Sequence, residues 1–198
     1  MQLQWRNSEQ MPVIRILLLV NAIILSAEYI YTLSFEENGS IENAQVFVLF
    51  ITMLCFLYAT FTCHIRPFAL LCTLTCFAFL LREVDVEDLN IPSLALALFS
   101  GKGKYASVLA LLCPTLYWTF KKHSLNFLVR DIGYRFKKFS IFIALFFVLS
   151  WIFDKGVVQT NNNPMLEELC EFNAYILIFF ISIFYINQFS LRKIQEAD

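Results

Sequence analysis

Charged residues are scarce in this sequence. Asp, Glu, Lys and Arg together make up 16% of the 198 residues, whereas a soluble globular domain usually has about 25%. Gly and Pro are also scarce, with five of each, which excludes collagen-like and Gly/Pro-rich low-complexity chains. Apolar residues make up 59% and include 22 Phe. This balance argues against a soluble enzyme and against disorder, and it is typical of helices in lipid.

Long apolar runs predict six membrane-spanning helices. A helix needs about 20 residues to cross a hydrocarbon core of about 30 Å. The predicted spans are about 13–33, 44–62, 64–81, 105–120, 139–153 and 172–189. These runs are apolar on all sides, unlike the alternating pattern of a membrane β-strand. The sequence therefore predicts an all-α, polytopic membrane protein that forms one domain over residues 1–198.

The first run is interpreted as an uncleaved span, because Leu25-Ser26-Ala27 does not match the small-residue pattern of a signal-peptide cleavage site. Basic residues then predict the orientation. Eleven of the fifteen lie at the termini, in 121–138 or in the turn near His64, all on one predicted side. The positive-inside rule places this side and both termini in the cytoplasm.

The loop 121–138 combines six basic residues with apolar residues at helical spacing, among them Leu128, Ile132 and Phe136. This pattern predicts one cytoplasmic amphipathic helix on the inner leaflet, in contact with anionic lipids. The candidate residues for binding lipid headgroups are Lys121, Lys122, Arg130, Arg135, Lys137 and Lys138.

Acidic residues gather on the opposite predicted side, next to the ends of the spans. Glu28 is the most informative, because it lies within the first span, roughly 7–8 Å below its outer end at about 1.5 Å per residue. An ionisable residue at that depth is costly and is a functional-site candidate by default. We expect it to pair with Arg82 or Lys102, and Asn21 to extend a polar stripe on the same face. The ligand-binding candidates at this level are Glu28, Glu42, Gln45, Arg82, Glu83, Asp85, Glu168 and Glu171.

Residues 89–100, LNIPSLALALFS, are too apolar for an ordinary loop and too short to cross a bilayer. They predict an interfacial or re-entrant segment. The following Gly101-Lys102-Gly103-Lys104 is interpreted as a flexible cationic turn. The alternative, a phosphate- or carboxylate-binding turn, has weak support because the rest of a phosphate-loop signature is missing.

Metal and cofactor chemistry has little support in the sequence. His64 and His123 are the only histidines, neither has a second histidine near it in sequence, and both fall on the predicted cytoplasmic side. A multi-histidine zinc site or a haem held by two histidines is therefore not predicted. Carboxylates alone could still hold Mg²⁺ or Ca²⁺ at the acidic cluster.

Two motifs carry a resemblance. Glu37-Asn38-Gly39-Ser40-Ile41-Glu42-Asn43-Ala44-Gln45 precedes a span, and Leu81-Arg82-Glu83-Val84-Asp85 closes the next one. In these residues the chain resembles uncharacterised polytopic membrane proteins of bacteria. The resemblance covers the second and third predicted spans. It implies a multi-pass protein of the bacterial inner membrane, and it carries no established activity.

Three functions stay open. The leading hypothesis is a non-enzymatic protein that binds or passes a lipid-like or cationic ligand at the outward-facing acidic site, alone or assembled with a membrane partner or a second copy. The second is an intramembrane lipid hydrolase or transferase, in which burial keeps one carboxyl protonated and Arg82 keeps another ionised. The third is a structural membrane subunit. A net charge of −1 indicates no nucleic-acid partner.

Overall fold

The computed structural model describes residues 40–84, 92–158 and 163–189, together with Val13, Arg15, Leu17 and Asn21 of the first segment. This described part of the chain is all-α. Its elements are α2 (Ser40–Thr62), α3 (Arg66–Glu83), α4 (Ser93–Phe99), α5 (Gly101–Lys122), α6 (Leu125–Phe127), the π-helical segment η2 (Leu128–Gly133), α7 (Tyr134–Asp154) and α8 (Asn163–Phe189).

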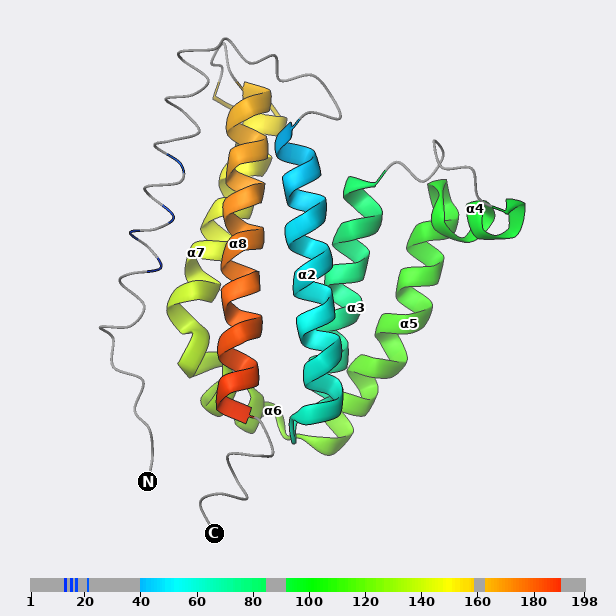
Figure 1. Ribbon diagram of the computed structural model, residues 1–198, viewed down its shortest axis with the longest axis vertical. Helices are drawn as coiled ribbons and strands as arrows, with labels where there is room; N and C mark the ends of the chain where they lie inside the picture. Colours follow the sequence, from blue (N-terminus) through cyan, green and yellow to red (C-terminus); the bar gives the residue numbers. More distant parts are fainter. Residues whose placement is uncertain are drawn as a thin grey trace.

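The long helices stand side by side in the order α7, α8, α2, α3 and α5 (Figure 1). Helix α5 leans away from the bundle and packs against α3, while the short α4 lies beside the start of α5. The first residues of α2, α5 and α8 therefore lie at the same end of the bundle as the last residues of α3 and α7. We call this end the polar end and the opposite one the basic end.

Three helices in the described ranges are long and apolar enough to cross a membrane. They are Ile41–Thr62 in α2, Phe136–Asp154 in α7 and Asn163–Phe189 in α8. These helices contain the second, fifth and sixth predicted spans, and they indicate a multi-pass membrane protein. Helices α3 and α5 occupy the third and fourth predicted spans, but both carry charged residues at each end, which shortens their apolar stretch.

Four helices, α2, α5, α7 and α8, begin earlier than the apolar runs predict, and α8 does so by the most. Helix α8 begins at Asn163, nine residues before the predicted start at 172, and its first turns carry Glu167, Glu168 and Glu171. Pro164 follows Asn163 directly, and proline is favourable in the first turn of a helix because it needs no donor there. Hydropathy alone misses such a start, because the first turns of this helix are polar.

The segment 121–138 is not the one amphipathic helix that its spacing predicts: it comprises the end of α5, the short α6, η2 and the start of α7, with His123 and Ser124 outside any helix. Most of its apolar residues face the protein. Ile132 and Phe136 are only 4% and 6% exposed and belong to the main hydrophobic cluster. Leu125, at 62% exposure, is the large apolar residue that faces outwards. The apolar side chains predicted to contact the inner leaflet therefore mostly pack on the helical bundle instead.

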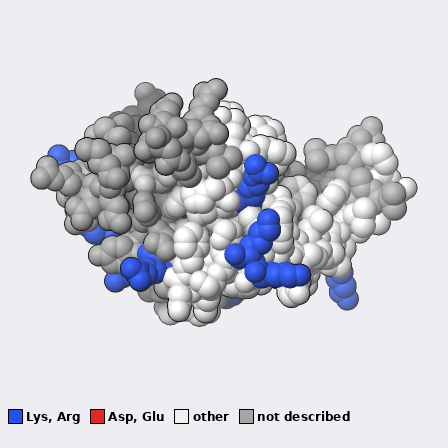
Figure 2. Space-filling view, turned by 90° about the horizontal axis from the view of Figure 1, so that it is seen from below, with Lys and Arg blue, Asp and Glu red and all other residues white. Residues whose placement is uncertain are grey.

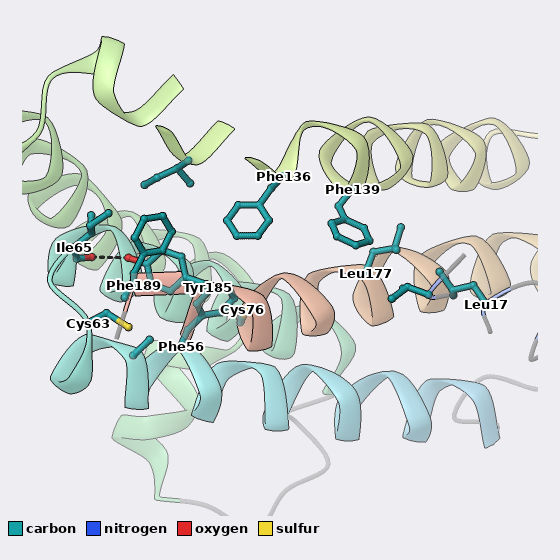
Figure 3. Close-up of a cluster of buried hydrophobic side chains, with 14 residues drawn as sticks. Leu17, Phe56, Cys63, Ile65, Cys76, Phe136, Phe139, Leu177, Tyr185 and Phe189 are labelled. Carbon is teal, nitrogen blue, oxygen red and sulfur yellow. Dashed lines mark hydrogen bonds between the residues drawn. The ribbon is translucent and has the colours of Figure 1, made fainter. Parts of the chain in front are cut away.

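The main hydrophobic cluster joins the basic ends of α2, α3, α7 and α8 (Figure 3). At its centre Tyr185 is fully buried, and its hydroxyl donates a hydrogen bond of 2.9 Å to the backbone oxygen of Ile65. Val13 and Leu17 also belong to this cluster. These two residues of the first segment thus pack against the bundle.

Candidate functional site

The polar end holds an ion-paired network, here called the arginine network. Arg82, at the end of α3, forms ion pairs with Glu171 of α8 and, at 2.8 Å, with Glu83. The second carboxylate oxygen of Glu171 accepts a 2.8 Å hydrogen bond from the Ser150 hydroxyl of α7. The Tyr175 hydroxyl of α8 donates one of 2.7 Å to Glu83. Three helices are therefore joined around two carboxylates.

Burial gives this network a structural role. Glu171 is 4% exposed, and a buried carboxylate is tolerated only when a positive charge and hydrogen bonds compensate for its lost hydration. Arg82 supplies the charge and Ser150 supplies the hydrogen bond on the other oxygen. Both oxygens of Glu171 are thus occupied by protein groups.

A second group of polar residues, here called the glutamine site, lies about one helical turn along α8. Gln45 of α2 is fully buried. Its amide nitrogen donates to the Glu168 carboxylate at 2.7 Å and to the Glu168 backbone oxygen at 2.9 Å. Glu42 precedes Gln45 by three residues, so both side chains lie near one face of α2. The site therefore contains two carboxylates and one amide.

The glutamine site has acceptors that no donor in the described part of the chain reaches. The amide oxygen of Gln45 and one carboxylate oxygen of Glu42 are buried and have no hydrogen-bond partner among the described residues. Leaving a buried polar atom unpaired costs about 1–3 kcal/mol. Two such acceptors at one site, three residues apart on one helix, fit a ligand that donates hydrogen bonds.

A pair of asparagines connects the first segment to α8. The amides of Asn21 and Asn173 donate to each other, both at 2.8 Å. Asn173 also donates to the backbone oxygen of Leu169 at 2.6 Å. This reciprocal pair sets the position of Asn21 along α8. It lies close to the arginine network along α8, because Asn173 follows Glu171 by two residues, about half a helical turn.

The structure brings six of the eight candidates to the polar end. Arg82, Glu83 and Glu171 form the arginine network, and Glu42, Gln45 and Glu168 form the glutamine site. The remaining two candidates, Glu28 and Asp85, lie outside the described residues. The expected pairing of Glu28 with Arg82 or Lys102 therefore stays a prediction.

Sequence reasoning missed Ser150, Tyr175 and Asn173. Each lies inside or beside a long apolar run, where a single Ser, Tyr or Asn gives no sign of what it faces. A usable signal was the spacing of Glu171 and Tyr175, which are four residues apart and therefore share a face of α8. Ser150 gave no such signal, because its partner is on another helix.

The described residues include possible metal ligands. Among the described residues, no group of three or more His, Cys, Asp or Glu side chains could hold a metal ion. In the glutamine site only Glu42 and Glu168 are of these types. The polar groups described in this site are the carboxylates of Glu42 and Glu168 and the amide of Gln45, which can all take part in hydrogen bonds.

The glycine-lysine turn has a packing role instead of a flexible one. Gly101 has a positive φ of 46°, which suits glycine, and the chain then enters α5 directly. A β-carbon at Gly103 would lie 1.9 Å from the backbone oxygen of Ala97, so glycine lets α4 pack closely on α5. Lys104 donates to the backbone oxygen of Leu81 at 3.2 Å and so ties α5 to the end of α3.

Basic side chains gather at the opposite end of the molecule (Figure 2). Lys121 and Lys122 end α5 and lie over the rings of Tyr117 and Trp118, at 5.9 and 5.2 Å from the ring centres. The other described basic side chains at this end are Arg66, Arg130, Lys137 and Lys138. The Arg135 side chain lies outside the description. Lysines beside Tyr and Trp are typical of a membrane interface.

The two histidines, which are far apart in sequence, both lie at the basic end, His64 between α2 and α3 and His123 after α5. Burial lowers the pKa of His123, and the nearby His64 and Lys122 lower it further. His64 in turn contacts the backbone oxygen of Phe189 through its Nδ1 atom, at 3.1 Å. Among the described residues, neither histidine belongs to a group of three or more side chains that could hold a metal ion.

Charge thus divides the described bundle into two ends. Of the described acidic residues, all except Asp131 lie at the polar end, whereas the basic end carries most of the described Lys and Arg residues.

Comparison with known proteins adds no further constraint: no protein-family model, curated protein or solved structure matches this chain. The function must be inferred from these two ends.

Proposed function

We propose that the chain is a six-span protein of the bacterial inner membrane that binds a lipid-like or cationic ligand at an outward-facing polar end. Both termini and the basic end would lie in the cytoplasm. The distribution of Lys and Arg supports this orientation, because cytoplasmic loops carry the excess of basic residues. The aromatic residues beside Lys121 and Lys122 suit the same interface.

The observation that carries the ligand proposal is the pair of buried, unpartnered acceptors on Gln45 and Glu42. The arginine network does not carry it, because Arg82, Ser150 and Tyr175 already satisfy its carboxylates. That network fits the alternative of a structural role and holds the helices in place. The neighbouring glutamine site contains two acceptors without a donor, on Gln45 and Glu42. A ligand with N–H donors or positive charge would satisfy them.

The arginine network does not supply the acid/base pair that a lipid hydrolase needs. An acid/base pair needs a carboxyl that can exchange protons with a substrate. Both oxygens of Glu171 are held by Arg82 and Ser150, which leaves none to act on a substrate. We therefore favour binding over catalysis.

Native mass spectrometry of the full chain, purified in a mild detergent, tests ligand binding. We expect a co-purifying small molecule or lipid that is lost from Glu42→Gln and Gln45→Met. The matched control is Glu167→Gln, a similar change on α8 outside the glutamine site. Equal ligand retention by all three variants, or no bound molecule in the parent protein, would contradict the proposal.

Reporter fusions test the orientation separately. A reporter fused after Lys138 should report the cytoplasm, and one fused after Asn162 should report the opposite compartment. The same compartment for both would reject the six-span arrangement, because only one predicted span separates the two positions.

A further inference from the structure

An apolar groove runs between α2 and α3 next to the polar end. It has a volume of about 410 Å³ and is lined by Val46 and Phe50 of α2 and by Phe77 and Leu80 of α3, among others. Ligand sites usually have volumes of roughly 300–1,000 Å³. The groove is open to the outside of the bundle, and Phe50, at its edge, is 47% exposed. In a membrane this opening faces the hydrocarbon chains of lipids.

One end of the groove lies near the glutamine site along α2. Asn43 and Val84 line the groove, and each is the direct neighbour in sequence of an acid, Glu42 or Glu83. Glu42 also precedes Val46 by four residues, so the two stand one above the other on the same stripe of α2. Glu42 therefore lies between the buried Gln45 amide and the apolar groove.

The unpartnered acceptors indicate that the bound group carries hydrogen-bond donors. An oxygen of Gln45 and an oxygen of Glu42 both need a donor, and the site contributes negative charge from Glu42 and Glu168. A primary ammonium group has three N–H donors, one positive charge and no acceptor. A quaternary ammonium group has the charge without any donor, so it would leave both oxygens unpaired.

We infer that the ligand is an aminophospholipid with a primary ammonium headgroup. The ammonium binds the free oxygens of Glu42 and Gln45, and an acyl chain lies in the groove between α2 and α3. This inference rests on the proposed function and names the ligand class for the same site. Negative charge from Glu42 and Glu168 and an apolar groove nearby along α2 match the two parts of such a lipid.

Lipid titration of the full chain, followed by native mass spectrometry, tests the inference. The probes are phosphatidylethanolamine and phosphatidylcholine with the same short acyl chains, and soluble phosphoethanolamine. We expect phosphatidylethanolamine to bind at least about ten-fold more tightly than phosphatidylcholine, because hydrogen bonds to charged groups contribute that much. Glu42→Gln should abolish this preference.

Two phenylalanines of α2 provide a matched test of the groove. Phe50 lines the groove, whereas Phe61 lies outside it and is 70% exposed. Phe50→Ala should weaken binding of both lipids several-fold, and Phe61→Ala should leave it unchanged. Both side chains are exposed, so neither substitution should unfold the protein.

Several results would overturn the inference. Equal binding of the two lipids by the parent protein would exclude recognition of a primary ammonium. Binding of phosphoethanolamine as tight as that of the lipid would exclude a role for the groove, while the proposed cationic ligand would stand. If neither lipid nor amine binds and Glu42→Gln changes nothing, the proposed function fails together with the inference.

Discussion

Arg82 and Glu171 are 89 residues apart in sequence and form an ion pair at the polar end of the bundle. Their environments differ: the Arg82 side chain is 47% exposed, whereas that of Glu171 is 5% exposed. Water can therefore hydrate the guanidinium if its partner is removed, but it cannot hydrate the carboxylate. The pair links α3 to α8. Without its partner, Arg82 could stay charged because water reaches it, whereas the buried Glu171 could not.

This asymmetry predicts unequal costs for the two halves of the pair. Arg82→Gln leaves Glu171 buried without a compensating charge and should cost about 3–5 kcal/mol of unfolding free energy. Glu171→Gln leaves a half-exposed arginine, still paired with Glu83, and should cost about 1–2 kcal/mol. Denaturant unfolding in detergent micelles measures both, and the double variant should be less destabilised than the sum. Equal single costs that add up would show that the pair is not coupled.

The asparagine pair should be stabilising only as a pair. Asn173→Leu leaves the Asn21 amide without its partner at a contact that the bundle partly buries, and should cost about 1–3 kcal/mol. Asn21→Leu should do the same. The double variant Asn21→Leu/Asn173→Leu replaces both amides by apolar groups and should recover part of the loss. If thermal unfolding of each variant matches that of the parent protein, the first segment does not pack on α8 through this contact.

Gly103 should not tolerate a β-carbon. Gly103→Ala places an atom 1.9 Å from the backbone oxygen of Ala97, so α4 has to move away from α5. We expect a loss of about 1–3 kcal/mol and faster hydrogen exchange in 93–99. Gly133→Ala is the matched control, because its β-carbon would lie 3.6 Å from the nearest atom, an ordinary contact. Similar exchange in both variants would exclude the close packing of α4.

Acidification should destabilise the basic end through His123. The pKa of this side chain is lowered from its ordinary value of 6.5 by burial and by His64 and Lys122. The unfolded chain therefore binds the proton more readily, and stability falls as the pH drops through about 6.5. Thermal unfolding at several pH values between about 7.5 and 5.5 should show this loss in the parent protein and a smaller one in His123→Gln. A pH dependence that is identical in the two proteins would rule out His123 as its source.

The positions of the helices follow from the sequence, because long apolar runs leave the backbone few alternatives in lipid. The 44–62 run and α2 end at the same residue. The start of α8 could not be placed in this way, since Glu167, Glu168 and Glu171 belong to its first turns. Hydropathy depends only on the residues of one segment. It cannot predict a polar helix start whose side chains bind residues of other helices.

The candidate site was predictable in its residue types and in its place at one end of the bundle, and not in its pairings. Acids beside helix ends pointed to Glu42, Glu168 and Glu171 together. The partner of Arg82 depends on how α3 and α8 pack, which no spacing within one segment specifies. Ser150 and Tyr175 complete the network from inside apolar runs, where sequence gives no reason to single them out.

The central claim is that the glutamine site binds a donor from outside the protein, and an experimental structure of the full chain in a lipid nanodisc tests it most directly. The account predicts a non-protein group within hydrogen-bonding distance, roughly 2.7–3.2 Å, of both the Gln45 amide oxygen and the free Glu42 carboxylate oxygen. It also predicts an acyl chain in the groove between α2 and α3. Protein side chains donating to both oxygens, with no ligand between Glu42 and Gln45, would contradict it.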